Sequence, residues 1–369
     1  MQLTPIFDAK VWAAVPFHFW SLVFFVLGSL VGSFLNVCIH RMPRGESVVR
    51  PSSHCPHCRY AIPWYLNVPL LTWVMLRGRC RNCGAPIAVR YVLVELLTAV
   101  AFLSCWLSFG GTSAVLALVY AMVLAAFIAA TFIDFEHLII PDEITIGGMV
   151  AGVLVSVLVP GMHQAAGRVQ SLERSFVGLA VGAGVVYGIL RLGKWLYGRK
   201  DLDLGGRVTL WFTESCLRLP SEDVAYEDLF YRESDAVELR AWRVEMLDRC
   251  YADVDVRLSQ KVLQVGPDRF DPEQIEWLEV VTDRIRLPQE AMGFGDVTFM
   301  GAIGAFLGWQ AVLFSLMLSA FMGAAVGMAL IVFGKREWSS RIPYGPYIAL
   351  AATVWIFHGS DVVRWWLGR

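Results

Sequence analysis

The sequence lacks an excess of charge of either sign. Its 369 residues include 31 basic and 32 acidic side chains, which gives a formal net charge of −1. This balance provides no overall positive field that would indicate a nucleic-acid partner. The sequence also lacks the marks of a cleaved secretory signal, because Asp8 and Lys10 stand where a basic cluster would be and no Ala-x-Ala-like site precedes Gly32. We therefore expect the first apolar run to be retained as a helix, and no binding to nucleic acid.

Apolar residues dominate the sequence and make up 56% of it. This share is too high for a soluble domain and is typical of a multi-pass protein surrounded by a lipid bilayer. The long apolar runs predict an all-α polytopic membrane protein with about eight transmembrane helices. The expected helices cover Phe17–Ile39, Val92–Phe109, Ala114–Ile133, Ile144–Val159, Phe176–Leu192, Val297–Leu307, Ala311–Phe333 and Ile342 to Phe357.

Arginine is concentrated in the loop at residues 41–90, which contains eight arginines and a single acid, Glu46. The positive-inside rule places this loop in the cytoplasm. Eight spans counted from there put both termini on the external side. They also put Asp134, which follows the third span, and Asp296, which precedes the sixth, on the same cytoplasmic face.

Two Cys-x-x-Cys pairs lie on this loop, at Cys55 and Cys58 and at Cys80 and Cys83. A disulfide framework is disfavoured in the cytoplasm, where thiols stay reduced. Each pair can form a tight turn with both thiolates facing inward, and two such turns form a closed four-thiolate site, which is typical of structural zinc. We interpret His57 as a surface residue of the first turn rather than a fifth ligand.

Two acid motifs lie where apolar runs meet polar segments. The first runs from Asp134 to Pro141 and Asp142, and the second is Gly293-Phe-Gly295-Asp296. A carboxylate near a bilayer is costly and is therefore a functional candidate, although a single acid most often only marks a helix end in water. Glycines next to an acid permit close backbone approach and unusual dihedral angles. Two carboxylates that lie close together can have different pKa values, so that one is protonated while the other is ionised. Acid–base activation of a water molecule requires such a pair.

These motifs, in this order, resemble those of the bacterial type IV prepilin peptidases, bifunctional leader peptidases and N-methyltransferases of the Gly-x-Gly-Asp intramembrane aspartyl protease group. The stretches Gly32–Val37 and Pro343–Pro346 resemble further motifs of that family. A glycine and an asparagine in the first stretch also predict close helix packing. By position, the resemblance implies that Asp134 and Asp296 are the catalytic pair and that Asp142 is the second acid of the first motif.

The resemblance implies an enzyme of the bacterial inner (cytoplasmic) membrane, serving type IV pilus or type II secretion systems, with its catalytic face and zinc loop in the cytoplasm. It would cleave the leader peptide of type IV pilin-like precursors and then N-methylate the new N-terminal residue with S-adenosylmethionine. Either Asp134 or Asp296 would act as general base on a water molecule, while the other, protonated, polarises the scissile carbonyl. Gly293 and Gly295 would support the pair. No Gly-x-Gly-type nucleotide motif accompanies the methyl donor, so methyl transfer depends on the resemblance alone.

Two other functions stay open. One is a prepilin-type peptidase without methyltransferase activity, and the complete cysteine tetrad argues against it. The other is a non-catalytic membrane scaffold that presents the zinc loop, and two acid motifs on one membrane face argue against that.

Residues 200–290 differ from the rest of the chain, with 21 acids, 12 bases and no run long enough to span a membrane. Alternating residues at Leu210–Thr213 and Val254–Leu258 predict half-buried strands, and Ser234–Tyr251 predicts an amphipathic helix. We expect a small soluble α+β insertion in the cytoplasm, where the family has a shorter connection. The expected organisation is a first transmembrane helix (1–40), a zinc loop (41–90), helices two to five (91–199), the insertion (200–290) and helices six to eight (291–369).

Overall fold

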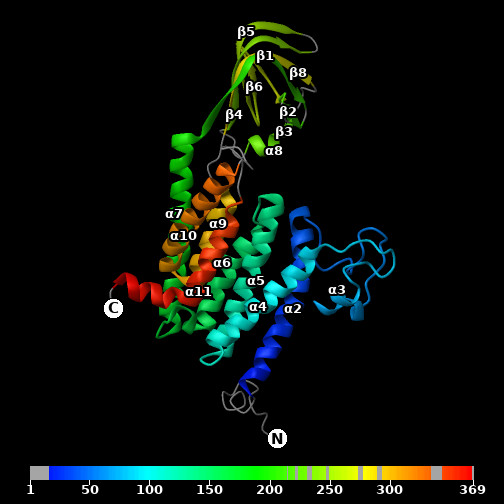
Figure 1. Ribbon diagram of the computed structural model, residues 1–369. Coiled ribbons are helices and arrows are strands. Elements are labelled where there is room, and N and C mark those ends of the chain that lie inside the picture. The colour runs from blue at the N-terminus through cyan, green and yellow to red at the C-terminus, as the bar shows by residue number, and fades with distance from the viewer. Residues whose placement is uncertain are drawn as a thin grey trace. The chain divides into compact units, whose positions relative to one another are not determined.

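A computed structural model shows two compact units, one formed by Met1–Val186 with Phe294–Arg369 and the other by Tyr187–Gly293 (Figure 1). The basic cluster Lys335–Arg341, the start of the last expected span at Ile342 and the N-terminal Asp8 and Lys10 lie outside the residues that the structure describes. The described residues are 16–213, 215–220, 223–230, 235–246, 249–272, 277–288, 293–333 and 343–367.

The first unit is helical, and helices form at all eight predicted spans. Five of the described helices are long and apolar enough to cross a membrane, namely those within Phe17–Arg44, Val89–Phe109, Ala114–His137, Arg168–Trp195 and Trp309–Val332. The α-helices are α2 (Phe17–Arg41), α3 (Leu71–Met75), α4 (Val89–Phe109), α5 (Ala114–His137), α6 (Asp142–Leu158), α7 (Arg168–Tyr197, which continues into the second unit), α9 (Phe294–Leu307), α10 (Trp309–Val332) and α11 (Gly345–Leu367). Short 3₁₀ turns form at η1 (Met42–Arg44), η2 (Trp64–Leu66) and η3 (Pro160–His163).

Helices α2 and α4 pack backbone to backbone along a stripe of small residues. A Cβ atom added to Gly28 would lie 2.8 Å from the Cα of Ala99, and one added to Gly32 would lie 2.7 Å from the Cα of Glu95. Only glycine permits this approach, which is how helices associate in lipid. The predicted close packing of the first span is therefore confirmed.

Helix α9 is surrounded by other helices, because its residues from Asp296 to Ala305 are all buried. On α7, Gly178 lies against the backbone of Gly304, and on α6 an added Cβ at Gly152 would lie 2.8 Å from the Cβ of Ala305. A helix that is apolar all round belongs in the interior of a bundle. The Gly-x-Gly-Asp motif is thus held at the start of a central helix.

The second unit is a single antiparallel sheet in the order β3-β2-β1-β8-β4-β5-β6-β7. Its strands are β1 (Arg199–Thr213), β2 (Cys216–Arg218), β3 (Asp223–Ala225), β4 (Ala236–Glu245), β5 (Cys250–Ser259), β6 (Leu263–Val265), β7 (Asp268–Phe270) and β8 (Trp277–Pro288). The predicted strands at Leu210–Thr213 and Val254–Leu258 are confirmed, because they lie within β1 and β5.

The amphipathic helix predicted for Ser234–Tyr251 is wrong, because the described part of this stretch contains β4 and the start of β5. Val237, Leu239 and Ala241 alternate onto the buried face and pack in the core of the sheet. Among the described residues between β1 and β8, the only helix is the short α8 (Tyr226–Leu229). The insertion is therefore an antiparallel sheet rather than the expected α+β domain.

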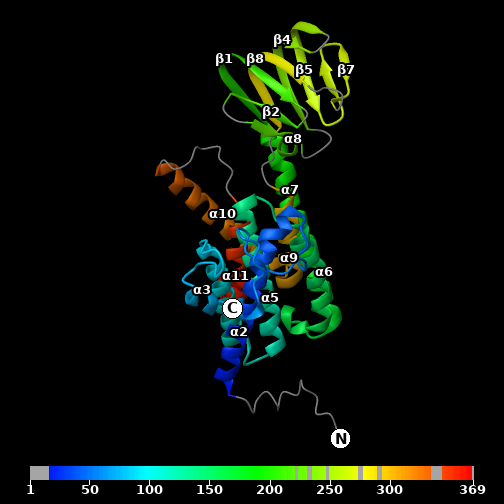
Figure 2. The same cartoon turned by 90° about the vertical axis from the view of Figure 1, so that its right-hand side faces the viewer.

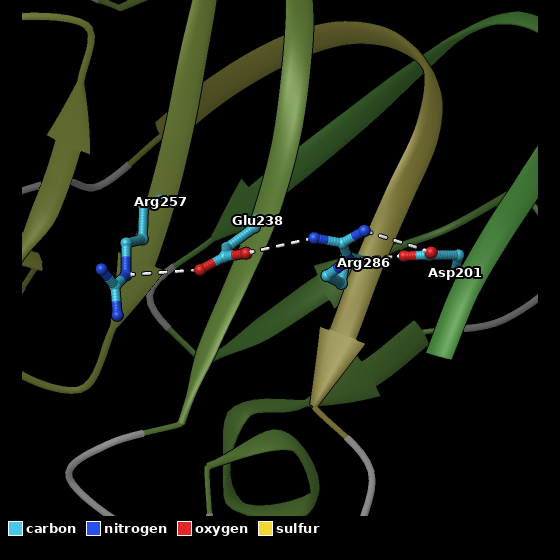
Figure 3. A network of polar contacts seen from close by, with 4 residues as sticks. All are labelled: Asp201, Glu238, Arg257 and Arg286. Carbon is cyan, nitrogen blue, oxygen red and sulfur yellow. Dashed lines mark hydrogen bonds and ion pairs between the residues drawn. The ribbon is translucent and has the colours of Figure 1, made fainter. Parts of the chain in front are cut away.

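The other face of this sheet carries ion pairs that cross from strand to strand (Figure 3). Arg286 of β8 contacts Asp201 of β1 at 2.6 Å and Glu238 of β4 at 3.7 Å, and Glu238 contacts Arg257 of β5 at 3.7 Å. Arg286 lowers the pKa of Asp201 through its hydrogen bonds. Because water reaches these side chains, such pairs contribute little to the stability of the sheet.

Candidate functional site

Asp134 lies in the last turn of α5 and is 5% exposed. The helix ends there because Leu138 adopts a left-handed conformation (φ 56°), and its N–H donates to the carbonyl of Asp134 at 3.0 Å. The carboxylate accepts a hydrogen bond of 2.8 Å from the backbone N–H of Gly345, the first residue of α11. Asp134 therefore satisfies one of the free N–H groups at the positive end of a second helix.

Asp296 lies in the first turn of α9 and is 9% exposed. The residue before it, Gly295, packs against the chain that follows Asp134: an added Cβ would lie 3.4 Å from both the Cβ and the carbonyl oxygen of Ile140. Gly295 is not in the left-handed region, so the expectation of an unusual dihedral angle is wrong there. Close approach is what this glycine provides.

The segment Tyr344–Gly345 joins the two acid motifs. A Cβ added to Gly345 would lie 2.8 Å from Asp134 Oδ2 and 3.1 Å from Ile140 Cδ1. Ile140, which lies against Gly345, also lies against Gly295, the residue before Asp296. Three segments far apart in sequence thus meet around two buried carboxylates.

Sequence reasoning assigned no role to Gly345 or Tyr344, although both lie in the Pro343–Pro346 stretch that resembles a family motif. The Tyr344 hydroxyl is held at 2.9 Å from the Ser319 hydroxyl of α10. Of the other predicted residues, Asp142 and Gly293 are exposed, in contrast to the two buried aspartates. Glu136, two residues after Asp134, forms an ion pair with Arg90 of α4.

The four cysteines of the loop converge, as their spacing predicts. Their sulfur atoms all lie within 4.8 Å of one another, with Cys55 and Cys83 at 3.9 Å and Cys58 and Cys80 at 4.0 Å. Four thiolates at a Zn–S distance of 2.3 Å form a tetrahedron with edges of roughly 3.8 Å. The observed spacing fits that geometry, so the cluster can hold a metal ion.

The two cysteine pairs are built in the same way. In the first, the N–H of Arg59 donates to the carbonyl of Cys55 at 2.9 Å, and in the second, the N–H of Gly84 donates to the carbonyl of Cys80 at 2.9 Å. Both donor residues adopt a left-handed conformation, with φ of 56° and 72°. A hydrogen bond from Asn82 lowers the pKa of Cys58 to about 6, whereas the pKa of Cys83 is raised to about 11, as expected of neighbouring thiols that titrate together.

Two family profiles match the chain. The Bacterial Peptidase A24 N-terminal domain matches residues 26–109, which include the four cysteines. The Type IV leader peptidase family matches residues 121–217 and 280–328, which include both acid motifs and omit most of the antiparallel sheet.

Curated relatives carry the name prepilin leader peptidase/N-methyltransferase. The Aeromonas hydrophila protein is 28% identical over 96% of this chain and 95% of its own length. The Legionella pneumophila protein is 23% identical over 95% of both chains. The Myxococcus xanthus protein is 49% identical over 138 residues, 37% of this chain and 40% of its own. No solved structure matches the chain. With five membrane-length apolar helices among its described residues, the chain is an integral membrane protein, and it belongs to the type IV leader peptidase family.

Proposed function

We propose that this protein removes the leader peptide from type IV pilin-like precursors and then N-methylates the new N-terminal residue with S-adenosylmethionine as methyl donor. The observation that supports it most is the meeting of the Asp134, Asp296 and Gly345 segments at one buried site. The names of relatives that align over nearly the whole chain support both activities.

In this proposal the two aspartates divide the acid–base work. One carboxylate is ionised and takes a proton from the attacking water, and the other is protonated and donates a hydrogen bond to the carbonyl oxygen of the scissile peptide. Burial supports the division, because a desolvated carboxylate ionises less readily than one in water. Asp142, which is exposed, and the motif glycines Gly293 and Gly295 would support the pair rather than react.

The cysteine cluster would hold a structural zinc ion. The four thiolates of Cys55, Cys58, Cys80 and Cys83 would complete its coordination, so that no position stays open for catalysis. The ion would supply folding energy to the loop at residues 41–90, because such loops order only when the metal binds. Peptide cleavage in this proposal uses the aspartates alone.

The proposed topology adds α6, α9 and α11 to the five long apolar helices, which makes eight spans. Helix α9 has 14 residues, about 21 Å at 1.5 Å per residue, and is short for a full crossing. The eight arginines of residues 41–90 would keep that loop and the aspartates at the cytoplasmic face of the bacterial inner membrane. The proposed boundaries are 1–40, 41–90, 91–199, 200–290 and 291–369, with the antiparallel sheet as the insertion.

The test is to incubate the purified protein in lipid with a pilin-type precursor, with and without labelled S-adenosylmethionine. Mass spectrometry should show the leader removed in both cases and a methyl group only with the donor. Asp134→Asn and Asp296→Asn should each abolish cleavage, and Asp142→Asn should keep most of it because Asp142 is exposed. Near-normal processing by either of the first two variants would refute the catalytic assignment, and cleavage without methylation would leave a peptidase alone.

A further inference from the structure

The stretch Trp64–Leu76, between the two cysteine pairs, contains no charged residue. It forms η2 and α3, and it turns its large apolar side chains outward: Trp64 is 82% exposed, Met75 is 80% exposed, and Leu71 and Val74 are exposed as well. We propose that this stretch, the apolar segment, inserts into the lipid bilayer beside α2 and α4 and anchors the cysteine loop to the membrane surface.

The apolar segment lies beside the spanning helices rather than beyond their ends. The backbone N–H of Leu70 donates to Glu95 Oε2 at 2.7 Å. Glu95 lies five residues beyond Arg90 in α4, about 7 Å along the helix axis. It also lies level with Gly32 of α2, nine residues before Arg41 and roughly 14 Å from that charged end. Leu70 is therefore held against the side of α4, at the level of its first turns, rather than beyond the charged helix ends.

The pictures agree with this placement. In two views at right angles, α3 lies beside the length of α2 rather than beyond its end (Figures 1 and 2). A depth of about 7–14 Å below charged helix ends passes through the headgroup layer and reaches the edge of the hydrocarbon, where interfacial segments bury their apolar faces by about 5–10 Å. The exposed side chains of the apolar segment therefore face the same surroundings as Leu30, which is exposed on α2.

The backbone hydrogen bonds of the apolar segment also suit contact with lipid. A segment in contact with lipid must pair its N–H groups within the protein, because the hydrocarbon has no water to accept them. Besides the bond from Leu70 to Glu95, the N–H groups of Thr72, Val74 and Leu76 donate to carbonyls four residues earlier. The indole N–H of Trp73 turns inward and donates to the carbonyl of Ile87 at 3.4 Å. These N–H groups are thus paired within the protein, and Asn67 is the exposed polar side chain of the segment.

The residues on either side of the apolar segment are suited to a membrane interface. Arg59 precedes the apolar segment, Arg77 follows it, and both are exposed. Guanidinium groups at this position can pair with anionic lipid phosphates, while Trp64 and Tyr65 have the amphipathic rings that settle at a membrane interface. Apolar side chains, interfacial aromatics and flanking arginines are together the composition of a segment that lies on a bilayer.

The test uses the full chain, one copy per lipid nanodisc, in phosphatidylglycerol and phosphatidylethanolamine. A nitroxide is attached through a ketone-bearing amino acid, so that the native cysteines stay intact, at position 75, 30 or 49. Leu30 is the lipid-facing reference, and Val49 is an exposed apolar residue of the same loop outside the apolar segment. We expect the label at 75 to collide with dissolved oxygen and to be shielded from a water-soluble nickel complex, as at 30 and opposite to 49.

Insertion of the apolar segment is refuted if the label at 75 meets the nickel complex as often as the label at 49. Shielding that appears only after a precursor is added, or only with two copies per disc, would also overturn it and assign the surface to substrate or to a second chain. For a second variant the nitroxide is attached at position 64. The V74D/M75D substitutions should raise nickel access to that label while the metal content is retained, and V49D should not raise it. Unchanged access in V74D/M75D would count against insertion.

Discussion

Substitution of Gly345 by alanine gives a sharp test of the aspartate site, because it leaves both carboxylates in the sequence. The new Cβ would lie 2.8 Å from Asp134 Oδ2 and 3.1 Å from Ile140 Cδ1. Carbon and oxygen atoms in contact prefer about 3.5 Å, so the carboxylate must move by several tenths of an ångström or rotate away. Either movement weakens its 2.8 Å hydrogen bond from the Gly345 N–H.

The size of the effect follows from that bond. A hydrogen bond to a charged group contributes about 1.5–3 kcal/mol. At 1.36 kcal/mol per factor of ten, its loss corresponds to a roughly 10- to 150-fold decrease in rate if the same geometry serves the transition state. Misplacement of a reacting group by about 1 Å costs a similar factor, on the order of 100-fold. We therefore expect kcat for leader removal to decrease by about one to two orders of magnitude in G345A.

The matched control is G147A, the same change on α6, where an added Cβ meets nothing within 4 Å. Precursor cleavage should be near normal in G147A, and methylation of an already cleaved peptide should be normal in both variants. Equal cleavage rates for G345A and G147A would refute the idea that the start of α11 positions Asp134.

Two further predictions concern the loop and the sheet. A C58S/C83S variant should lose most of its bound metal, measured on the purified protein by elemental analysis, because two of four thiolates are removed; full metal content would place the ligands elsewhere. Deletion of 202–288 with a short linker should leave the turnover of a precursor intact. The chain enters and leaves the sheet on neighbouring strands, because Arg199 of β1 is paired with Pro288 of β8, so a short linker can join the two ends. Complete loss of cleavage in a correctly inserted deletion variant would make the sheet part of the catalytic machinery.

The sequence predicted what depends on short spacing or on membrane sidedness. The cysteine tetrad follows from two Cys-x-x-Cys pairs, and its convergence is confirmed. Topology alone predicted that the Asp134 and Asp296 motifs lie on one face, and their segments do meet. The contact of Gly345 with Asp134 could not be predicted, because it joins residues 211 positions apart through a backbone N–H that any residue except proline provides.

The errors have physical causes too. In β4, the register with β8 is constant, with Leu239 opposite Ile285 and Arg243 opposite Val281, but the buried positions do not alternate along the whole strand. Buried Ala241 and Val244 are then three apart, a spacing that also suits a helix. The apolar segment was not predicted because its sequence has no clear period. Its thirteen residues without charge are also too few for a membrane span.

The two buried carboxylates of α4 and α5 share one structural task. Glu95 accepts the N–H of Leu70, and Asp134 accepts the N–H of Gly345, so each fixes a segment from outside its own helix. A substitution that removes the acceptor oxygen at either position would leave the N–H group unpaired in surroundings that lack water. An unpaired buried N–H group lowers the stability of the fold by about 1–3 kcal/mol. Asparagine keeps an acceptor oxygen and removes the ionisation, whereas alanine removes both. For that reason Asp134→Asn disturbs the start of α11 less than Asp134→Ala does and is the better test of the acid–base chemistry.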